Sequence, residues 1–298
     1  MSGPNKANPI PSVSGRSSSE TASAISLSQC STRRRYGITR RQISTYRSSS
    51  ICISTRTPTS QELTENIRFS HGRGSNPLQY AWFAETLASH GYIVAAPYHY
   101  RANIYDSTIA YLANKLWQRP LDISFDITAL LNDPAWGKRV DAARIGIAGH
   151  SQGDFTSLWI GGAKVNADKY LAFQKGWKNN PSVPQYLRDE LPLYPAPALS
   201  LHDKRIKAAF AMAPGIIKAF GMDQDQLSIP TYITVSARDT QAPPGDNAEF
   251  AAKHIPHAEL SSLATWITRS SSMNATTRGA TSSQRPASSA GRRPRLDR

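Results

Sequence analysis

Short, predominantly apolar runs, each bounded by polar or turn-forming residues, recur through the middle of the chain. They lie at residues 92–97, 144–148, 206–212 and 229–235, with weaker candidates at 67–71 and 258–263. Between them, apolar residues recur at helical spacing in segments 76–91, 120–132, 155–160 and 248–253. Continuous runs of this length are typical of strands buried on both faces. Strands that alternate with helices predict an α/β fold, with a mostly parallel sheet and helices on both faces.

Composition divides the chain into a neutral middle and two basic ends. The formal net charge is +14, and nearly all of it falls in residues 1–60 and 266–298, which are rich in Ser, Thr and Arg. Segments with so little apolar surface cannot offset the entropy that folding costs. We therefore expect poorly ordered basic arms at 1–60 and 266–298, around a folded domain at 61–265. Within that domain, the Lys- and Pro-rich segment 163–206 indicates a small cap-like helical insertion over the sheet.

The sequence gives no support to several functional classes. Both cysteines, Cys30 and Cys52, lie in the first arm, so no disulfide framework, zinc site or thiol nucleophile is predicted. The runs Arg33–Arg35 and Arg40–Arg41 could contact phosphates, but no recognisable binding motif accompanies them, and we expect no specific nucleic-acid partner. No apolar run reaches membrane-spanning length and no secretory signal is visible, so the chain as written is expected to be cytoplasmic and free of the membrane.

The pentad Gly149-His150-Ser151-Gln152-Gly153 follows directly on the apolar run 144–148. A Gly-x-Ser-x-Gly pentad between a strand and a helix presents a nucleophilic serine on a sharp, strained turn. The glycines let a substrate approach the Ser151 hydroxyl, and the amino end of the following helix points at the same place. The alternative is a Gly-rich turn of some other α/β protein, in which Ser151 only caps the helix.

Ester hydrolysis by serine also needs backbone N–H groups that hold the developing oxyanion. One should be the amide of Gln152, directly after the nucleophile. The second should come from a loop after an earlier strand, where the glycines of segment 70–74 lie, and we assign it to the Arg73 amide. An ordinary strand-to-helix glycine turn is the alternative for that segment.

A carboxylate must orient the base, and Asp239 is the best candidate for this triad acid. It follows the apolar run 229–235 and precedes Pro243 and Pro244, which make a rigid turn at the carboxyl end of the predicted strand. Three other carboxylates in this part of the chain are better explained as solvated loop or helix-start residues; they are Asp223, Asp225 and Asp246.

The general base is the residue that the sequence places least well. Only His254 and His257 follow Asp239 in the chain. Both precede the run 258–263, so in a parallel sheet they lie at the amino end of that strand, roughly 20 Å from the catalytic edge at about 3.3 Å per residue. His257 is the candidate base only if this strand does not form; otherwise the chain lacks a well-placed base.

A set of segments resembles the bacterial dienelactone-hydrolase-like α/β-hydrolases, a family related to the platelet-activating-factor acetylhydrolases. The segments are Phe69–Gly72, Leu87–Pro97, Arg119–Asp122, Gly149–Gly153, Arg205–Ala208 and Asp239–Pro244, and the resemblance spans about residues 65–263. It implies the α/β-hydrolase fold, small esters or lactones as substrates, Ser151 as nucleophile and Asp239 as triad acid. It also implies that neither a cofactor nor a metal is needed.

The chain departs from the pattern of that family in two places. Members usually have glycine directly after the pentad, where this chain has Asp154. The family places its catalytic histidine on the loop after the last strand, and the chain has no histidine beyond His257. Because the resemblance ends there, we hypothesise that both ends of the chain are encoded outside the ancestral reading frame.

We therefore expect a serine-dependent hydrolase of carboxylic esters or lactones, impaired in this chain if no histidine serves as base. The alternative is a non-catalytic α/β-hydrolase-like scaffold whose basic arms bind acidic partners. Nucleic-acid binding through the arms alone is a third hypothesis, and it predicts an affinity that collapses with salt. The oligomeric state is left open by the sequence.

Overall fold

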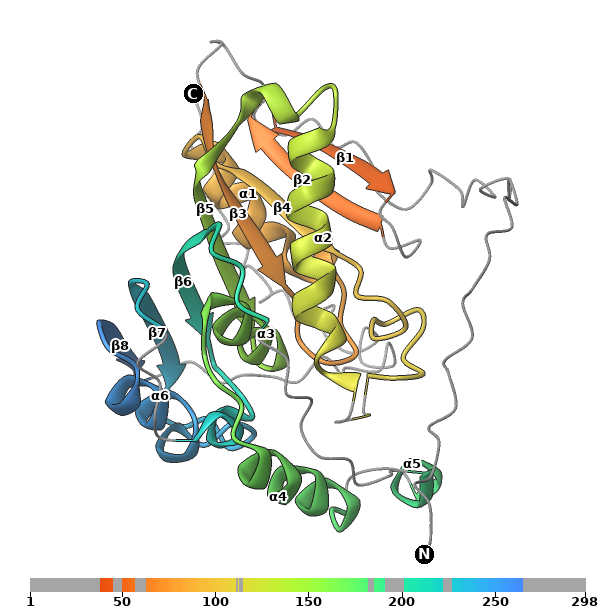
Figure 1. Cartoon of the computed structure of the whole chain (residues 1–298), viewed down its shortest axis with the longest axis vertical. Helices are drawn as coiled ribbons and strands as arrows, with labels where there is room; N and C mark the ends of the chain where they lie inside the picture. The colour runs from red at the N-terminus through yellow and green to blue at the C-terminus, as the bar shows by residue number, and fades with distance from the viewer. Residues whose placement is uncertain are drawn as a thin grey trace, which may run out of the picture.

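The strands that the structure describes form a single sheet. The computed structural model describes residues 38–44, 50–56, 63–110, 112, 115–181, 185–190, 201–221 and 227–264. The sheet has eight strands in the order β1-β2-β4-β3-β5-β6-β7-β8 (Figure 1). Their bounds are β1 Ile38–Ser44, β2 Ser50–Arg56, β3 Thr64–Ser70, β4 Ile93–Pro97, β5 Val140–His150, β6 Ile206–Met212, β7 Thr231–Ser236 and β8 Ala258–Leu263. Strands β4, β3, β5, β6, β7 and β8 are parallel to one another. Strand β2 pairs antiparallel with β4 on one side and with β1 on the other.

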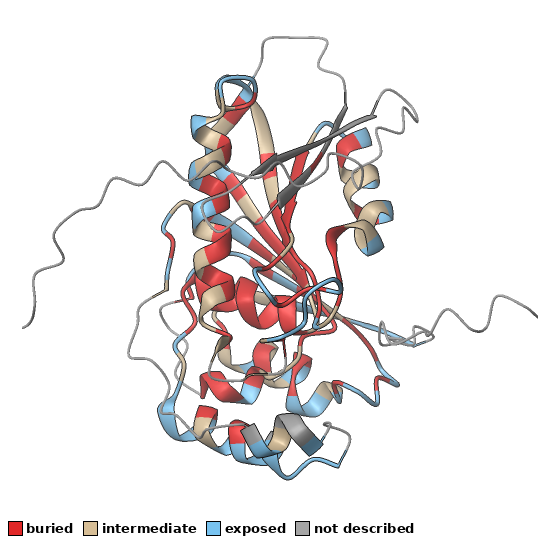
Figure 2. Cartoon of the chain, turned by 90° about the vertical axis from the view of Figure 1, so that its right-hand side faces the viewer, coloured by how far each residue is buried: buried red, intermediate tan, exposed pale blue. Residues whose placement is uncertain are grey.

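Helices pack on both faces of the sheet. They are α1 Ala81–Ser89, α2 Gln118–Asn132, α3 Gln152–Gly161, α4 Ala167–Lys178, α5 Gln185–Glu190 and α6 Ala248–His254. On one face, Phe83 of α1 packs with Phe69 and Val94. On the other, buried side chains of α2, α3 and α6 form an apolar core with Ile145 and Ile233. Figure 2 shows buried positions gathered in the sheet and in the helices against it, which confirms the predicted α/β class.

The apolar runs locate the central strands well. The runs at 206–212 and 258–263 coincide with β6 and β8, and β4 and β7 differ from their predicted bounds by one or two residues. Strand β5 begins at Val140, four residues before the run 144–148, because Asp141 and the exposed Ala142 and Ala143 interrupt the buried apolar pattern.

The segment 1–60 departs from the expectation of an unstructured arm, because it contributes β1 and β2. Strand β2 pairs antiparallel with β4, and Ile53 is completely buried in a cluster with Ile93, Ala95 and Leu130. The apolar stretch Ile51–Ile53 is only three residues long among Ser, Thr and Arg and does not stand out in composition, whereas the open edge of β4 supplies hydrogen bonds to any extended segment. Residues 1–37 and 266–298 lie outside the described residues.

Strand β3 carries a row of buried polar residues on the face that meets α2. Asn66, Arg68 and Ser70 alternate along the strand and are all fully buried. Burial lowers the pKa of Arg68 to about 10 even though the Asp126 carboxylate on α2 opposes this shift, and burial likewise raises the pKa of Asp126 well above its usual range. Because of this polar row, the hydrophobic pattern predicts the strand only weakly.

The segment 163–206 contains α4 and α5, beyond the end of the sheet toward which the arrows of β6 and β7 point (Figure 1). Tyr170 of α4 is fully buried and its ring centroid lies 6.5 Å from that of Trp159 on α3. Residues 191–200 lie outside the described residues. Among the helices that are described, none is long and apolar enough to cross a membrane.

If β2 belongs to the folded sheet, I53A should lower the free energy of unfolding by about 2–4 kcal/mol, because it leaves a cavity between the sheet and α2. Chemical denaturation of the purified chain measures this change. Leu63, which is 55% exposed just before β3, provides the control, and L63A should change stability by no more than about 0.5 kcal/mol. Equal effects of I53A and L63A would mean that β2 does not pack on the sheet.

Candidate active site

Ser151 occupies a strained turn between β5 and α3. Its backbone has φ 54° and ψ −118°, a conformation that residues other than glycine rarely adopt. Hydrogen bonds fix the turn from both sides: the Ser151 amide donates to Met212 O at 3.1 Å, and the Gly215 amide donates to Ser151 O at 3.3 Å. This is the sharp strand-to-helix turn that the pentad predicts.

The glycines of the pentad are required by close packing of α3 on the end of β3. A Cβ atom at Gly153 would overlap the carbonyl oxygens of Ser70 and His71, and one at Gly149 would lie 2.5 Å from the Gly153 carbonyl carbon. Only residues without a side chain let the first turn of the helix approach so closely. The amino end of α3 therefore lies directly beside the loop that follows β3.

The segments that carry the two proposed oxyanion donors lie side by side at this contact. Gln152 is the first residue of α3, where backbone amides have no partner within the helix, and its side chain is buried. Strand β3 pairs with β5 so that Ser70 lies opposite Gly149, which places the following loop next to the pentad. In that loop the Ser75 amide donates to Gly72 O, closing a turn that carries Arg73.

Asp239 lies at the same edge of the sheet as Ser151, two strands away. His150 pairs with Met212 on β6, Met212 pairs with Thr234 on β7, and Asp239 follows β7. The Asp239 side chain is buried, and its Oδ1 accepts hydrogen bonds from the amides of Gln241 and Ala242, both at 2.9 Å. Its Oδ2 has no hydrogen-bond partner, so the carboxylate is held in place with one oxygen uncommitted.

The alternative acids differ from Asp239 in their surroundings. Asp246 is exposed and pairs with Lys218 at 2.5 Å, as a solvated surface residue would. Asp223 and Asp225 lie outside the described residues.

His257 lies at the opposite edge of the sheet. It directly precedes β8, whose register runs from Ala258 opposite Thr231 to Leu263 opposite Ser236. The Thr231 amide donates to His257 O at 3.4 Å, at the start of β7. Because β8 forms as predicted, its length of roughly 20 Å separates His257 from the edge that carries Asp239. The structure does not bring His257 to Ser151.

The histidine nearest to the candidate acid is His150, within the pentad itself. Its Nδ1 lies 2.8 Å from the Tyr80 hydroxyl, which also accepts a hydrogen bond from the Gly72 amide at 3.3 Å. Burial lowers the pKa of His150 to about 4, and the charge of Asp239 opposes this shift only in part. His150 is therefore neutral at physiological pH, and it connects the pentad to the loop after β3 through Tyr80.

A second Ser-His-Asp arrangement lies deeper in the domain, and no motif in the sequence predicts it. Ser70 Oγ lies 2.9 Å from His99 Nε2, and His99 Nδ1 lies 3.0 Å from Asp122 Oδ2. Ser70 and His99 are completely buried and Asp122 is 4% exposed, so a substrate has no access to this serine. The three residues thus act as a structural link between β3, the loop after β4 and α2. The segment Arg119–Asp122 was noted as a motif, but nothing in its spacing indicated these partners.

Asp154 is the residue of this site whose environment is least favourable. It is completely buried in the first turn of α3, and neither carboxyl oxygen has a hydrogen-bond partner. Burial raises its pKa well above the usual range, and the nearby backbone amides of Met212 and Ser151 only partly oppose this. A protonated Asp154 is the form that this environment favours.

No cluster of three or more His, Cys, Asp or Glu side chains that could hold a metal ion occurs within the described ranges. Comparisons with family models and with curated proteins give no match to this chain. The functional interpretation therefore depends on the geometry of the site.

The buried carboxyl of Asp154 makes stability depend on pH. Its pKa in the folded state exceeds the unfolded value of about 3.9, so the folded state holds a proton that the unfolded state releases, and stability falls as pH rises above about 4. D154A removes this group, and at pH 8 we expect it to raise the free energy of unfolding by about 1–3 kcal/mol. Denaturant unfolding between pH 5 and pH 9, in about one-unit steps, should show the gain growing with pH.

Asp168 provides the matched control, because it lies in the first turn of α4 and is exposed. D168A should change stability little at any pH in this range. A gain from D154A that is absent, or that is the same at every pH, would contradict the buried and unpaired state of this carboxyl.

Proposed function

We propose that this chain is a serine-dependent hydrolase of carboxylic esters or lactones, with the α/β-hydrolase fold and Ser151 as its nucleophile. The observation that carries the proposal is the left-handed backbone of Ser151, at φ 54°, on the turn between a parallel strand and a helix. A mostly parallel sheet with an antiparallel second strand, and a buried aspartate after β7, are what we expect of such an enzyme and support the proposal further.

The chemistry would begin with attack of Ser151 Oγ on the acyl carbonyl carbon, whose oxygen becomes negatively charged. The amides of Gln152 and Arg73 would donate hydrogen bonds to that oxygen. Asp239 Oδ2, which has no other partner, would accept the N–H of an imidazole base and so hold the base in the correct tautomer. The intermediate would then collapse, breaking the bond to the alkoxy oxygen, which leaves as the alcohol with the proton lost by the Ser151 hydroxyl. Water would hydrolyse the acyl-enzyme to the carboxylic acid and free Ser151, and none of these steps requires a metal or a cofactor.

The base is the incomplete part of this machinery. The sequence has seven histidines, all within the described ranges, and no hydrogen bond among the described residues joins any of them to Ser151 or Asp239. An oxyanion site without its general base retains only a small part of the catalysis of a complete triad. We therefore infer slow turnover, several orders of magnitude below a complete relative.

A fluorophosphonate probe tests the nucleophile directly. The probe should form one covalent adduct per chain, detected by intact-protein mass spectrometry and mapped to the peptide that contains Ser151. S151A should abolish the adduct. S89A, which alters an exposed serine at the end of α1, should leave it unchanged. Absence of any adduct on the folded wild-type chain would favour the scaffold function instead.

The roles of Asp239 and His257 can be separated by the rate of this labelling. D239N should slow it by about 10²- to 10⁴-fold only if a base acts through this carboxylate, and by far less if no histidine reaches Asp239, which is the result that the structure favours. H257N, in which asparagine tolerates the left-handed backbone of that position at φ 58°, should label at the wild-type rate. A loss with H257N comparable to that with D239N would show that His257 reaches the site after all.

A further inference from the structure

Arg119 lies buried between the two segments that carry the proposed oxyanion donors. It belongs to the first turn of α2 and is 2% exposed. Its Nη2 donates hydrogen bonds to the carbonyl oxygen of His71 and, at 3.3 Å, to Ser70 Oγ. Its Nε donates to Thr156 Oγ1 on α3 at 3.1 Å. One guanidinium group therefore contacts both the end of β3 and the helix that follows Ser151.

Each of these contacts continues to one of the donors. The His71 carbonyl lies two residues before Arg73 on the same loop. The Thr156 hydroxyl, which accepts from Arg119, itself donates to the carbonyl oxygen of Gln152 at 3.3 Å. The Thr156 side chain thus links Arg119 to Gln152. The His71 carbonyl that Arg119 binds lies two residues before Arg73.

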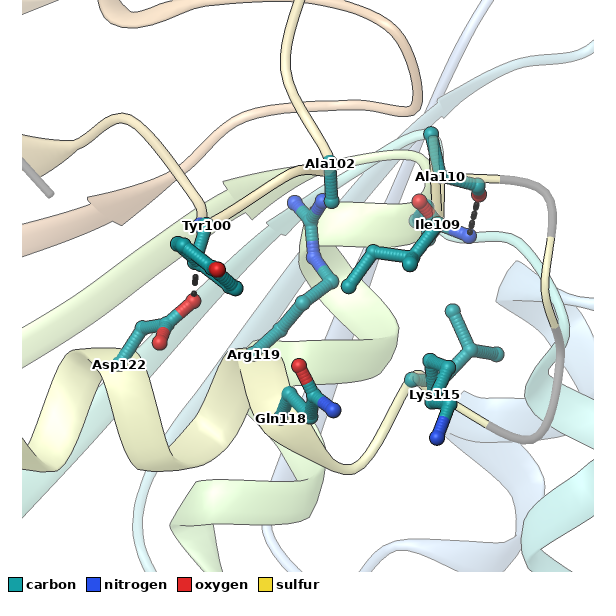
Figure 3. A pocket seen from close by; sticks show the side chains of 10 residues that line it. Tyr100, Ala102, Ile109, Ala110, Lys115, Gln118, Arg119 and Asp122 are labelled. Atoms are coloured by element: carbon teal, nitrogen blue, oxygen red, sulfur yellow. Dashed lines mark hydrogen bonds between the residues drawn. The ribbon is translucent and has the colours of Figure 1, made fainter. Parts of the chain in front are cut away.

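A small cavity forms another connection between Arg119 and Gln152. It measures about 10 Å³, the room of about one water molecule, and its lining residues include Tyr100, Arg119, Asp122 and Gln152. Figure 3 shows Arg119 rising from α2 beside this cavity, with Tyr100 and Asp122 on one side. The side-chain amide of Gln152 donates through Nε2 to Ala110 O at 3.4 Å, so this side chain also contacts the loop after β4.

The chemistry of the guanidinium suits this place. Its planar fork holds several acceptors at fixed angles, which an ammonium group on a flexible stem cannot do. Burial lowers the pKa of Arg119 to about 10, opposed by Asp122, so the group stays charged near neutral pH. Asp122 also binds His99, which in turn contacts Ser70, so the position of this cation is fixed from α2 as well as from β3.

We propose that Arg119 is a positioning residue that sets the separation between the two oxyanion amides, those of Arg73 and Gln152. The inference rests on the proposed hydrolase function. A buried cation that only filled space would have no need to contact both donor segments, whereas a shift of about 1 Å between two oxyanion donors is enough to slow catalysis by about 10²-fold.

R119K tests the proposal, because lysine keeps the positive charge but cannot bridge the two segments. With a fluorophosphonate probe, kinact, the limiting rate of covalent labelling at Ser151, should fall by about 10- to 100-fold. The probe concentration that gives half of that rate, KI, should stay within about threefold of wild type. Hydrogen exchange followed by mass spectrometry should become faster in peptides that cover 71–74 and 152–156, and not elsewhere. Arg205 provides the matched control: it binds Asp203, Thr128 and Ser124 far from Ser151, and R205K should leave kinact unchanged.

T156V provides a second route if R119K does not fold. It keeps the volume and the whole of Arg119 but removes the hydroxyl that joins the guanidinium to Gln152, and kinact should fall by about 5- to 10-fold. A wild-type rate in R119K or T156V, or faster exchange spread over the whole domain, would overturn the positioning role. Failure of the proposed function is visible separately, because the wild-type chain itself would then form no adduct at Ser151, and the positioning role would fall with it.

Discussion

The left-handed backbone at Ser151 is the constraint on which the site depends. A conformation of this kind costs about 1–3 kcal/mol and persists only where the surroundings over-determine it. Here the turn is held by hydrogen bonds to Met212 and Gly215, and the first turn of α3 is pressed against β3 with no space for a side chain at Gly153. Because the helix cannot move away from the strand, the nucleophile and the loop after β3 are positioned by the same contact.

Several polar groups are buried around this turn, and their burial lowers the stability of the domain. Arg68 and Asp126 are enclosed between β3 and α2 without hydrogen-bond partners, and Asp154 is enclosed at the start of α3. Buried polar groups lower stability when they lack hydrogen-bond partners. The apolar cores on both faces of the sheet must offset them, which makes large-to-small changes in those cores more consequential than in a purely apolar interior.

The order of the central elements followed from the sequence, because fully buried parallel strands are continuous apolar runs and their helices keep a 3.6-residue period. The pentad likewise located the turn at Ser151, since its glycines answer a steric need that any sequence must meet in the same way. Strand β2 was missed because its apolar stretch, Ile51–Ile53, is only three residues long and is flanked by polar residues. The link from Ser70 through His99 to Asp122 was missed for a different reason: it joins three elements far apart in the chain, and local patterns do not encode such contacts.

The sheet ends at β1 on one side, and only one strand, β2, connects that end to the parallel strands. The hairpin can therefore detach as a unit without breaking any pairing among the strands that carry Ser151 and Asp239. Detachment would uncover the backbone of β4 together with Ile93 and Ala95, an apolar edge of the kind that recruits strands from other molecules. In this chain β2 thus covers an edge of β4 that would otherwise be open to strand pairing between molecules.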